Sequence, residues 1–176
     1  LKSSGSIIAG AALVAPLAQP HPGYAADEST IKIALVGCGG RGTGAAKNAM
    51  EQTGPPINLV AMADVFEHRL ASSYNAIQKT LPNQTKVPED QKFIGFDGYK
   101  KLLASGVDVV LLTTPPGFRP IHLRAAVEAG KHVFCEKPVA VDVPGVKSVI
   151  ESAKLAKEKG TGLCSGYCYR YDQAKR

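Results

Sequence analysis

Three glycines directly after the first apolar run constrain the fold of this chain more than any other feature. The run at residues 31–36 is IKIALV, and the text after it, GCGGRG, places Gly37, Gly39 and Gly42 in the spacing G-x-G-x-x-G. Glycine at these positions allows a tight turn, a close backbone approach to a diphosphate, and close packing of a following helix on a sheet. A strand before the glycines and a helix after them predict a dinucleotide-binding turn. A glycine-rich turn of purely structural origin is the alternative.

Gly40 and Arg41, which lie between the second and third of these glycines, belong to the predicted turn as well. The helix that begins there would present unpaired N–H groups and the positive end of its dipole to the phosphates. We therefore predict that a dinucleotide contacts Gly37, Gly39, Gly40, Arg41 and Gly42.

Short apolar runs alternate with amphipathic segments along the rest of the chain. Such runs occur at residues 31–36, 57–64, 107–114, 131–136 and 162–171, with a further short strand and helix within 92–105. Strands that are apolar along their whole length are typical of a parallel sheet covered on both faces. The alternation predicts right-handed crossovers and an α/β fold, a doubly wound parallel sheet of the Rossmann type.

Length and composition bound the class of protein. The chain has 176 residues, of which 44% are hydrophobic and 20% charged, as expected for one globular domain. Its net charge of +6 comes from scattered lysines and arginines without interleaved aromatic residues. This pattern argues against nucleic acid as a partner and leaves a modest preference for anionic small molecules.

The first 29 residues differ from the remainder. They open with Leu1 and the basic Lys2, continue with a weakly apolar Ala-rich and Gly-rich stretch, and end with proline and small residues, which is the layout of an export signal. The opening resembles the tail of a twin-arginine signal, so we expect a periplasmic protein with no membrane association after export. If the leader carries no address, the protein is cytoplasmic. We place the dinucleotide-binding domain at residues 30–166.

The four cysteines show no metal-type spacing, and no cluster of histidines lies near them. Three of them occur in or beside apolar strand-like runs, where a free cysteine usually behaves as a small buried hydrophobe. We therefore predict core thiols and no metal site for Cys38, Cys135, Cys164 and Cys168.

Asp64 ends the second predicted strand. A carboxylate at this position can accept hydrogen bonds from both adenosine ribose hydroxyls, and it would repel a 2′-phosphate. NAD is therefore favoured over NADP, although Arg69 lies close enough in sequence to soften the preference. The alternative role for Asp64 is a helix N-cap.

The loop after the fourth main strand has the text TTPPGFRP, whose prolines and glycine prevent immediate helical continuation. In a doubly wound sheet this strand lies across the switch point from the first one, so its carboxyl end should line the cofactor crevice. Thr113, Thr114 and Pro115 are predicted to pack on the nicotinamide side. A plain surface turn is the alternative.

The next strand ends in an adjacent acid and base, in the text HVFCEKPVA. Glu136 and Lys137 would lie at its carboxyl end, over the same crevice, with Pro138 closing the turn. Together with GCGGRG, MAD, TTPP and GYCYRY, the stretch AGKHVFCEKP resembles the Gfo/Idh/MocA family of glucose-fructose oxidoreductase and inositol dehydrogenase. The resemblance runs from Ile31 to the end of the chain.

The resemblance implies an NAD(P)-dependent oxidoreductase that acts on a CH–OH group of a sugar or cyclitol. By that resemblance Glu136 and Lys137 are catalytic and contact the cofactor, with Lys137 assisting proton movement and Glu136 orienting it. The Lys137–Pro138 bond is often cis in relatives. Arg170 and Tyr171 correspond to residues near the substrate.

The sequence also departs from the family pattern. Many relatives have a histidine where this chain has Arg119, and His122 is three residues late. Relatives continue with a second α/β domain that holds the substrate pocket and mediates oligomerisation, and that domain is absent from this chain. Residues 167–176 are expected to begin the connection to it, so we expect a cofactor-binding half of a homo-oligomeric protein.

Two other functions remain open from the sequence. One is a glycosidase that uses tightly held NAD to oxidise and re-reduce a sugar without net redox change. The other is a nucleotide-binding module without catalytic activity, against which the Glu-Lys pair argues.

Overall fold

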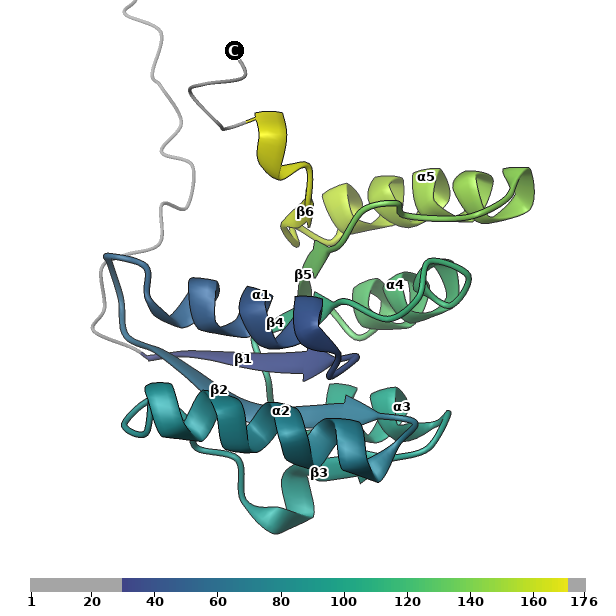
Figure 1. Ribbon diagram of the computed structural model, residues 1–176. Coiled ribbons are helices and arrows are strands. Elements are labelled where there is room, and N and C mark those ends of the chain that lie inside the picture. The colour runs from purple at the N-terminus through teal and green to yellow at the C-terminus, as the bar shows by residue number, and fades with distance from the viewer. Residues whose placement is uncertain (1–29, 171–176) are drawn as a thin grey trace, which may run out of the picture.

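The computed structural model describes residues 30–170 of the chain. The predicted export leader at residues 1–29 and the predicted substrate-side residue Tyr171 lie outside the described residues. The described part forms one six-stranded sheet with helices on both faces (Figure 1).

All neighbouring strands of the sheet are parallel, and their order is β3-β2-β1-β4-β5-β6. This order confirms the predicted doubly wound Rossmann fold, because the chain builds one half outward from β1 and then returns to build the other half from β4. The strands are β1 Ile31–Val36, β2 Ile57–Asp64, β3 Lys92–Ile94, β4 Val109–Leu112, β5 His132–Cys135 and β6 Leu163–Ser165.

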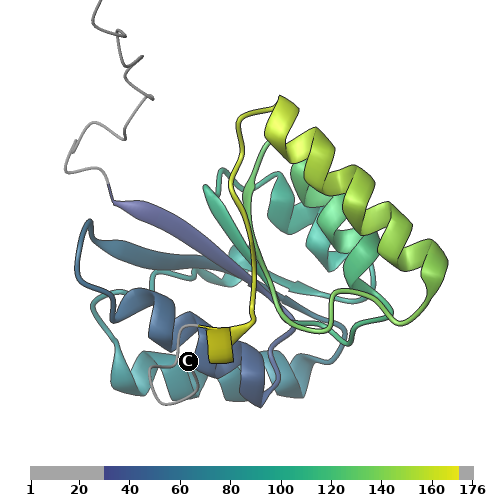
Figure 2. The same cartoon turned by 90° about the horizontal axis from the view of Figure 1, so that it is seen from above.

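The helices form two layers, one on each face of the sheet (Figure 2). Right-handed crossovers place the helices of the two half-sheets on opposite faces. One layer contains α1 Gly40–Met50 and α2 Glu67–Thr80, and the other contains α3 Gly98–Leu103, α4 Arg119–Glu128 and α5 Val143–Glu158. No helix within residues 30–170 is long and apolar enough to span a membrane.

The central strand β1 divides its side chains between two apolar cores. Ile33 and Leu35 pack under α1 and α2, whereas Ala34 and Val36 pack under α3, α4 and α5. Successive side chains of a strand point to opposite faces, so a continuously apolar strand supplies both cores. This is why β1 shows no alternation of polar and apolar residues.

Two helices end at glycines. Gly130 follows α4 and Gly160 follows α5, with backbone φ angles of 70° and 69°. Glycine adopts this left-handed conformation without the steric cost that a Cβ imposes. Each turn returns the chain toward the start of the next strand.

The end of the described chain differs from the prediction. β6 stops at Ser165 and is followed by a tight turn and a 3-10 helix at Cys168–Arg170, so the predicted strand over residues 162–171 was too long. The prediction of four core thiols was right for two cysteines and wrong for the other two. Cys38 and Cys135 are buried, but Cys164 and Cys168 are exposed.

The physical reason for the exposed cysteines lies in the sheet edge. Cys164 is on the edge strand β6, beyond the part of the sheet that α1 and α2 cover. Cys164 and Cys168 line an open groove of about 350 Å³ between α1 and strands β5 and β6. An apolar run at a sheet edge therefore does not guarantee burial on both faces.

The contact between α1 and the first turn yields a stability prediction. A Cβ at Gly42 would collide with the carbonyl oxygen of Gly37 and lie 2.5 Å from Thr113 Oγ1, whereas a Cβ at Gly44 would meet nothing within 4 Å. We expect Gly42→Ala to lower the free energy of unfolding by about 2–3 kcal/mol through overpacking. Gly44→Ala, on the same helix, should raise it by about 0.5–1 kcal/mol. Chemical denaturation measures both, and equal effects of the two substitutions would contradict the packing argument.

Candidate functional site

A cleft of about 620 Å³ opens at the carboxyl edge of the sheet. Its walls are the loops that follow β1, β2, β3 and β4, together with the first turn of α4. The strand order reverses between β1 and β4, and in doubly wound sheets ligands bind in the crevice beside that reversal. The described topology therefore places this cleft where a dinucleotide is expected.

Glycine is needed at the three positions of the first turn for different reasons. Gly37 has a φ of +96°, and a Cβ there would lie 2.6 Å from the backbone nitrogen of Thr114. Gly42 lets α1 approach the carbonyl group of Gly37. Gly39 has an ordinary φ of −74°, lines the cleft, and would place a Cβ in open space. The fold itself therefore requires two of the glycines, while the third keeps a space in the cleft open.

Asp64 is held rigidly at the end of β2, on the cleft wall. Its Oδ2 accepts a hydrogen bond from the N–H of Cys38 at 2.6 Å, and its Oδ1 accepts one from Phe66 at 2.9 Å. The N-cap of α2 is Phe66, so the alternative role of Asp64 as N-cap is not observed. Each carboxylate oxygen has a second lone pair for a ligand donor. Arg69 stands over the Phe66 ring at 5.5 Å, also on the cleft wall.

The loop after β4 forms another wall of the cleft. Thr113 Oγ1 donates to the carbonyl oxygen of Gly37 at 2.6 Å, so this side chain supports the glycine turn. Thr114 Oγ1 lies 3.2 Å from His122 Nδ1 on α4. Thr113, Thr114 and Pro115 all line the cleft, and the loop is therefore more than a plain surface turn.

An aromatic cluster completes this side of the cleft. The His122 ring lies 4.3 Å from the Tyr99 ring and stacks on Phe118 at 6.1 Å, measured between centroids. His122 is only 8% exposed, and burial lowers its pKa to about 4, so its imidazole is neutral near pH 7. Sequence reasoning missed this cluster because its members come from α3, α4 and the loop between β4 and α4, with no shared spacing.

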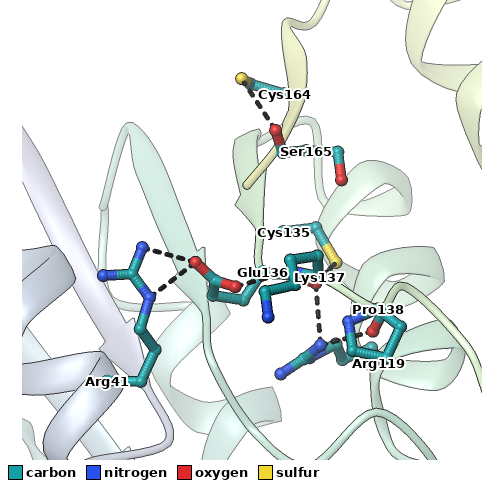
Figure 3. Close-up of polar contacts among 8 residues, drawn as sticks. All are labelled: Arg41, Arg119, Cys135, Glu136, Lys137, Pro138, Cys164 and Ser165. Carbon is teal, nitrogen blue, oxygen red and sulfur yellow. Dashed lines mark hydrogen bonds and ion pairs between the residues drawn. The ribbon is translucent and has the colours of Figure 1, made fainter. Parts of the chain in front are cut away.

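Glu136 is buried between β5 and the first turn, with 2% of its surface exposed (Figure 3). Its Oε1 accepts a hydrogen bond from Arg41 Nε at 2.7 Å and lies 2.5 Å from Arg41 Nη2. Its Oε2 accepts a hydrogen bond from the backbone N–H of Lys137 at 2.8 Å. A Cβ at Gly166 would lie 2.7 Å from Oε1, so this glycine makes room for the carboxylate. No sequence pattern linked Gly166 to Glu136.

Lys137 is exposed at the end of β5, and its bond to Pro138 is cis, as the family resemblance implied. The side chain of Arg119 approaches the same turn from the side opposite to Arg41 (Figure 3). Arg119 Nη1 donates to the carbonyl oxygen of Glu136 at 2.9 Å and to that of Pro138, and Nε donates to Thr114 at 2.7 Å. Sequence reasoning noted Arg119 only as a departure from the family.

Arg170 belongs to the 3-10 helix after β6 and is exposed. This helix follows the strand next to β5 and lies outside the cleft lining. The predicted cofactor residues that line the cleft are Gly37, Gly39, Asp64, Thr113, Thr114 and Pro115. The others, Gly40, Arg41, Gly42, Glu136 and Lys137, lie outside the cleft lining, as does Arg170.

Comparison with known proteins decides the family. Residues 31–167 match the family described as "Oxidoreductase family, NAD-binding Rossmann fold". The chain belongs to the Gfo/Idh/MocA family.

Curated members of the Gfo/Idh/MocA family include similar inositol dehydrogenases. The chain is 28% identical over 148 residues to inositol 2-dehydrogenase 3 of Saccharopolyspora erythraea, covering 84% of this chain and 39% of that enzyme. It is 35% identical over 97 residues to inositol 2-dehydrogenase of Serratia proteamaculans, covering 53% of this chain and 28% of that enzyme. The chain therefore spans less than half the length of these relatives.

Two solved structures of similar proteins contain a nicotinamide cofactor. Scyllo-inositol dehydrogenase from Lactobacillus casei, with bound NAD(H) and scyllo-inositol, has a TM-score of 0.62 and 25% identity, covering 83% of this chain and 38% of that one. The WlbA dehydrogenase from Bordetella pertussis, in complex with NADH and UDP-GlcNAcA, has a TM-score of 0.59 and 28% identity. The match covers 77% of this chain and 34% of that one.

The cleft in this member of the Gfo/Idh/MocA family has the features that a dinucleotide requires. Gly39 leaves open space beside the N-terminus of α1, where helix dipole and N–H groups favour an anion. Asp64 presents carboxylate oxygens on the cleft wall beside this turn, where its Oδ2 accepts a hydrogen bond from Cys38. The residues present therefore fit an NAD-type cofactor.

The pair of Arg41 and Glu136 yields a second prediction. Arg41→Ala would leave a buried carboxylate without its cation, and we expect a loss of about 1–3 kcal/mol in the free energy of unfolding, reduced by the partial exposure of Arg41. Adding Glu136→Gln to Arg41→Ala should recover most of that loss, because the unpaired charge is gone. Denaturation of the single and double variants measures the coupling, with Arg124→Ala in the exposed pair with Glu128 as a control expected to stay within about 1 kcal/mol. Additive losses of stability from Arg41→Ala and Glu136→Gln would contradict a coupling between the two side chains.

Proposed function

We propose that this chain is the cofactor-binding part of a dehydrogenase that moves a hydride between a hydroxyl-bearing carbon of a sugar or cyclitol and a nicotinamide. The observation that carries the proposal is the joining of two features at one sheet edge. These are the cleft kept open at Gly39 and the turn of Glu136, Lys137 and Pro138 at the end of β5.

The first turn is the proposed holder of the diphosphate. The backbone of Gly37, Gly39, Gly40, Arg41 and Gly42 lies at the N-terminus of α1, which favours negative charge. The carboxylate of Glu136 would oppose a diphosphate nearby, but its ion pair with Arg41 compensates that charge. The half-exposed guanidinium of Arg41 retains further N–H donors for an anion.

Asp64 is the proposed acceptor for the adenosine ribose hydroxyls, which favours NAD over NADP. Hydrogen bonds from Cys38 and Phe66 hold its carboxylate in one orientation. A 2′-phosphate at this place would meet a fixed negative charge. Arg69 beside it is the cation that would reduce this repulsion.

Lys137 is the proposed proton acceptor, beside the wall formed by Thr113, Thr114 and Pro115. The bound cofactor supplies the hydride acceptor. Lys137 is exposed at the strand end, so its amine can reach a hydroxyl group and exchange the proton with solvent. Glu136 accepts a hydrogen bond from the Lys137 backbone and helps to orient the residue. Arg170 and Tyr171 are proposed to lie toward the substrate.

The substrate class follows from the relatives. The curated relatives named above are inositol dehydrogenases, and one solved relative holds scyllo-inositol together with NAD(H). We therefore propose a polyhydroxylated ring as the substrate of the full-length protein.

Lys137 yields a direct test in the full-length protein. NADH formation should appear with at least one member of a panel of cyclitols and sugars, and Lys137→Ala should lower kcat by about 100-fold or more. Lys131→Ala, at the other end of the same strand, is the matched control and should leave kcat within about twofold. Glycoside cleavage without net NADH formation, or an unchanged kcat in Lys137→Ala, would overturn the proposal.

Asp64 yields a test of cofactor choice. Asp64→Ser should weaken NAD binding by about tenfold and narrow the preference for NAD over NADP, because ribose hydrogen bonds are lost and the repulsion of a 2′-phosphate is removed. Asp97→Ser removes a carboxylate from the same cleft and serves as the control for charge alone. Calorimetric titration with each nucleotide measures the preference. Equal changes in the two variants would assign the effect to net charge and contradict the role of Asp64.

A further inference from the structure

Arg119 is a buried arginine that joins two loops of the site. It is the first residue of α4, and only 6% of its surface is exposed. Its guanidinium donates hydrogen bonds to three backbone carbonyl oxygens, one after β4 at Thr114 and two after β5 at Glu136 and Pro138. One side chain therefore joins the loop after β4, which lines the cleft, to the turn after β5.

Arg119 carries a charged side chain at a buried position. Burial lowers the pKa of its guanidinium, while the nearby Cys135 and Glu136 oppose that shift. Arg119 forms no ion pair with a carboxylate of residues 30–170. Burying a charge is costly, and here charge-assisted hydrogen bonds to carbonyl groups offset that cost.

Two of the carbonyl groups that Arg119 binds belong to the residues on either side of Lys137 in the chain. Glu136 precedes Lys137 and Pro138 follows it, so Arg119 Nη1 holds the peptide units on both sides of that lysine. The Nε atom faces another direction and binds the neighbouring loop at Thr114. Only the planar fork of a guanidinium presents donors in these fixed directions, whereas a lysine ammonium is a single point.

We propose that Arg119 is a positioning residue that sets the place of Lys137 relative to the loop after β4. This inference rests on the proposed function of Lys137 as proton acceptor. The guanidinium donors of Arg119 are directed at backbone carbonyl groups. Its effect on the reaction therefore passes through the placement of Lys137.

A purely structural role for Arg119 predicts something different. A structural residue would change stability, cofactor affinity and turnover together, because the whole cleft would loosen. A positioning residue would change turnover far more than cofactor affinity, because the first turn and Asp64, the proposed holders of the diphosphate and the adenosine ribose, receive no hydrogen bond from Arg119. The split between kcat and nucleotide affinity therefore separates the two roles.

The experiment compares Arg119→Lys and Arg119→Gln with Arg124→Gln in the full-length protein. Arg124 is an exposed arginine of the same helix, bonded to Glu128, and is the matched control. We expect the Arg119 variants to lose about 100-fold in kcat, as a misplacement near 1 Å can cause, with the Kd for NAD within about threefold of wild type.

Added guanidinium should raise kcat of Arg119→Ala by about tenfold and leave kcat of Lys137→Ala unchanged. A kcat equal to that of Arg124→Gln, or a parallel loss of kcat and NAD affinity in Arg119→Lys, overturns the proposal.

Hydrogen exchange separates this inference from the proposed function. Amide exchange of peptides covering residues 114–118 and 136–140 should rise at least about tenfold in Arg119→Gln and stay unchanged in Arg124→Gln. This measurement needs no turnover. If the wild-type protein oxidises no alcohol, the proposed function fails while the exchange result still decides whether Arg119 holds the two loops. Unchanged exchange in those peptides would overturn the inference even if the dehydrogenase activity is present.

Discussion

A buried carboxylate organises the carboxyl edge of this sheet. Glu136 cannot lie at 2% exposure as an ion without a cation and hydrogen-bond donors, and Arg41 and the backbone of Lys137 supply them. Because Arg41 lies in the first turn of α1 and Glu136 follows β5, this pairing ties the first half of the fold to the second. The turn that carries Lys137 is placed by the same contacts.

The glycine turn shows how fold and function share a few residues. Gly37 and Gly42 are required by close packing against Thr114 and by the approach of α1 to the turn. Thr113 donates a hydrogen bond to the carbonyl group of Gly37, so the loop after β4 stabilises the turn. Gly39 has no such structural reason, and its missing side chain leaves room in the cleft. A motif of three glycines thus contains two different constraints.

The elements with strong local signals were predictable from the sequence. The spacing of Gly37, Gly39 and Gly42, the apolar strands and the glycines that end α4 and α5 depend on backbone sterics and periodicity, which are local properties. The burial of Cys164 and Cys168 was predicted wrongly because burial at a sheet edge depends on which helices cover that edge. The length of β6 was also predicted wrongly, because apolar residues alone do not continue the pairing with β5 beyond Ser165.

The sequence by itself determined the doubly wound fold, the dinucleotide-type turn and the acid-base pair at the end of β5, because each rests on residues adjacent in the chain. Only the tertiary structure decided the partners of that pair. Arg41 reaches Glu136 from 95 positions away, and Arg119 reaches both sides of Lys137 from another helix. Such contacts depend on how parallel strand ends converge at one edge, and this convergence is a property of the assembled sheet that no local pattern contains.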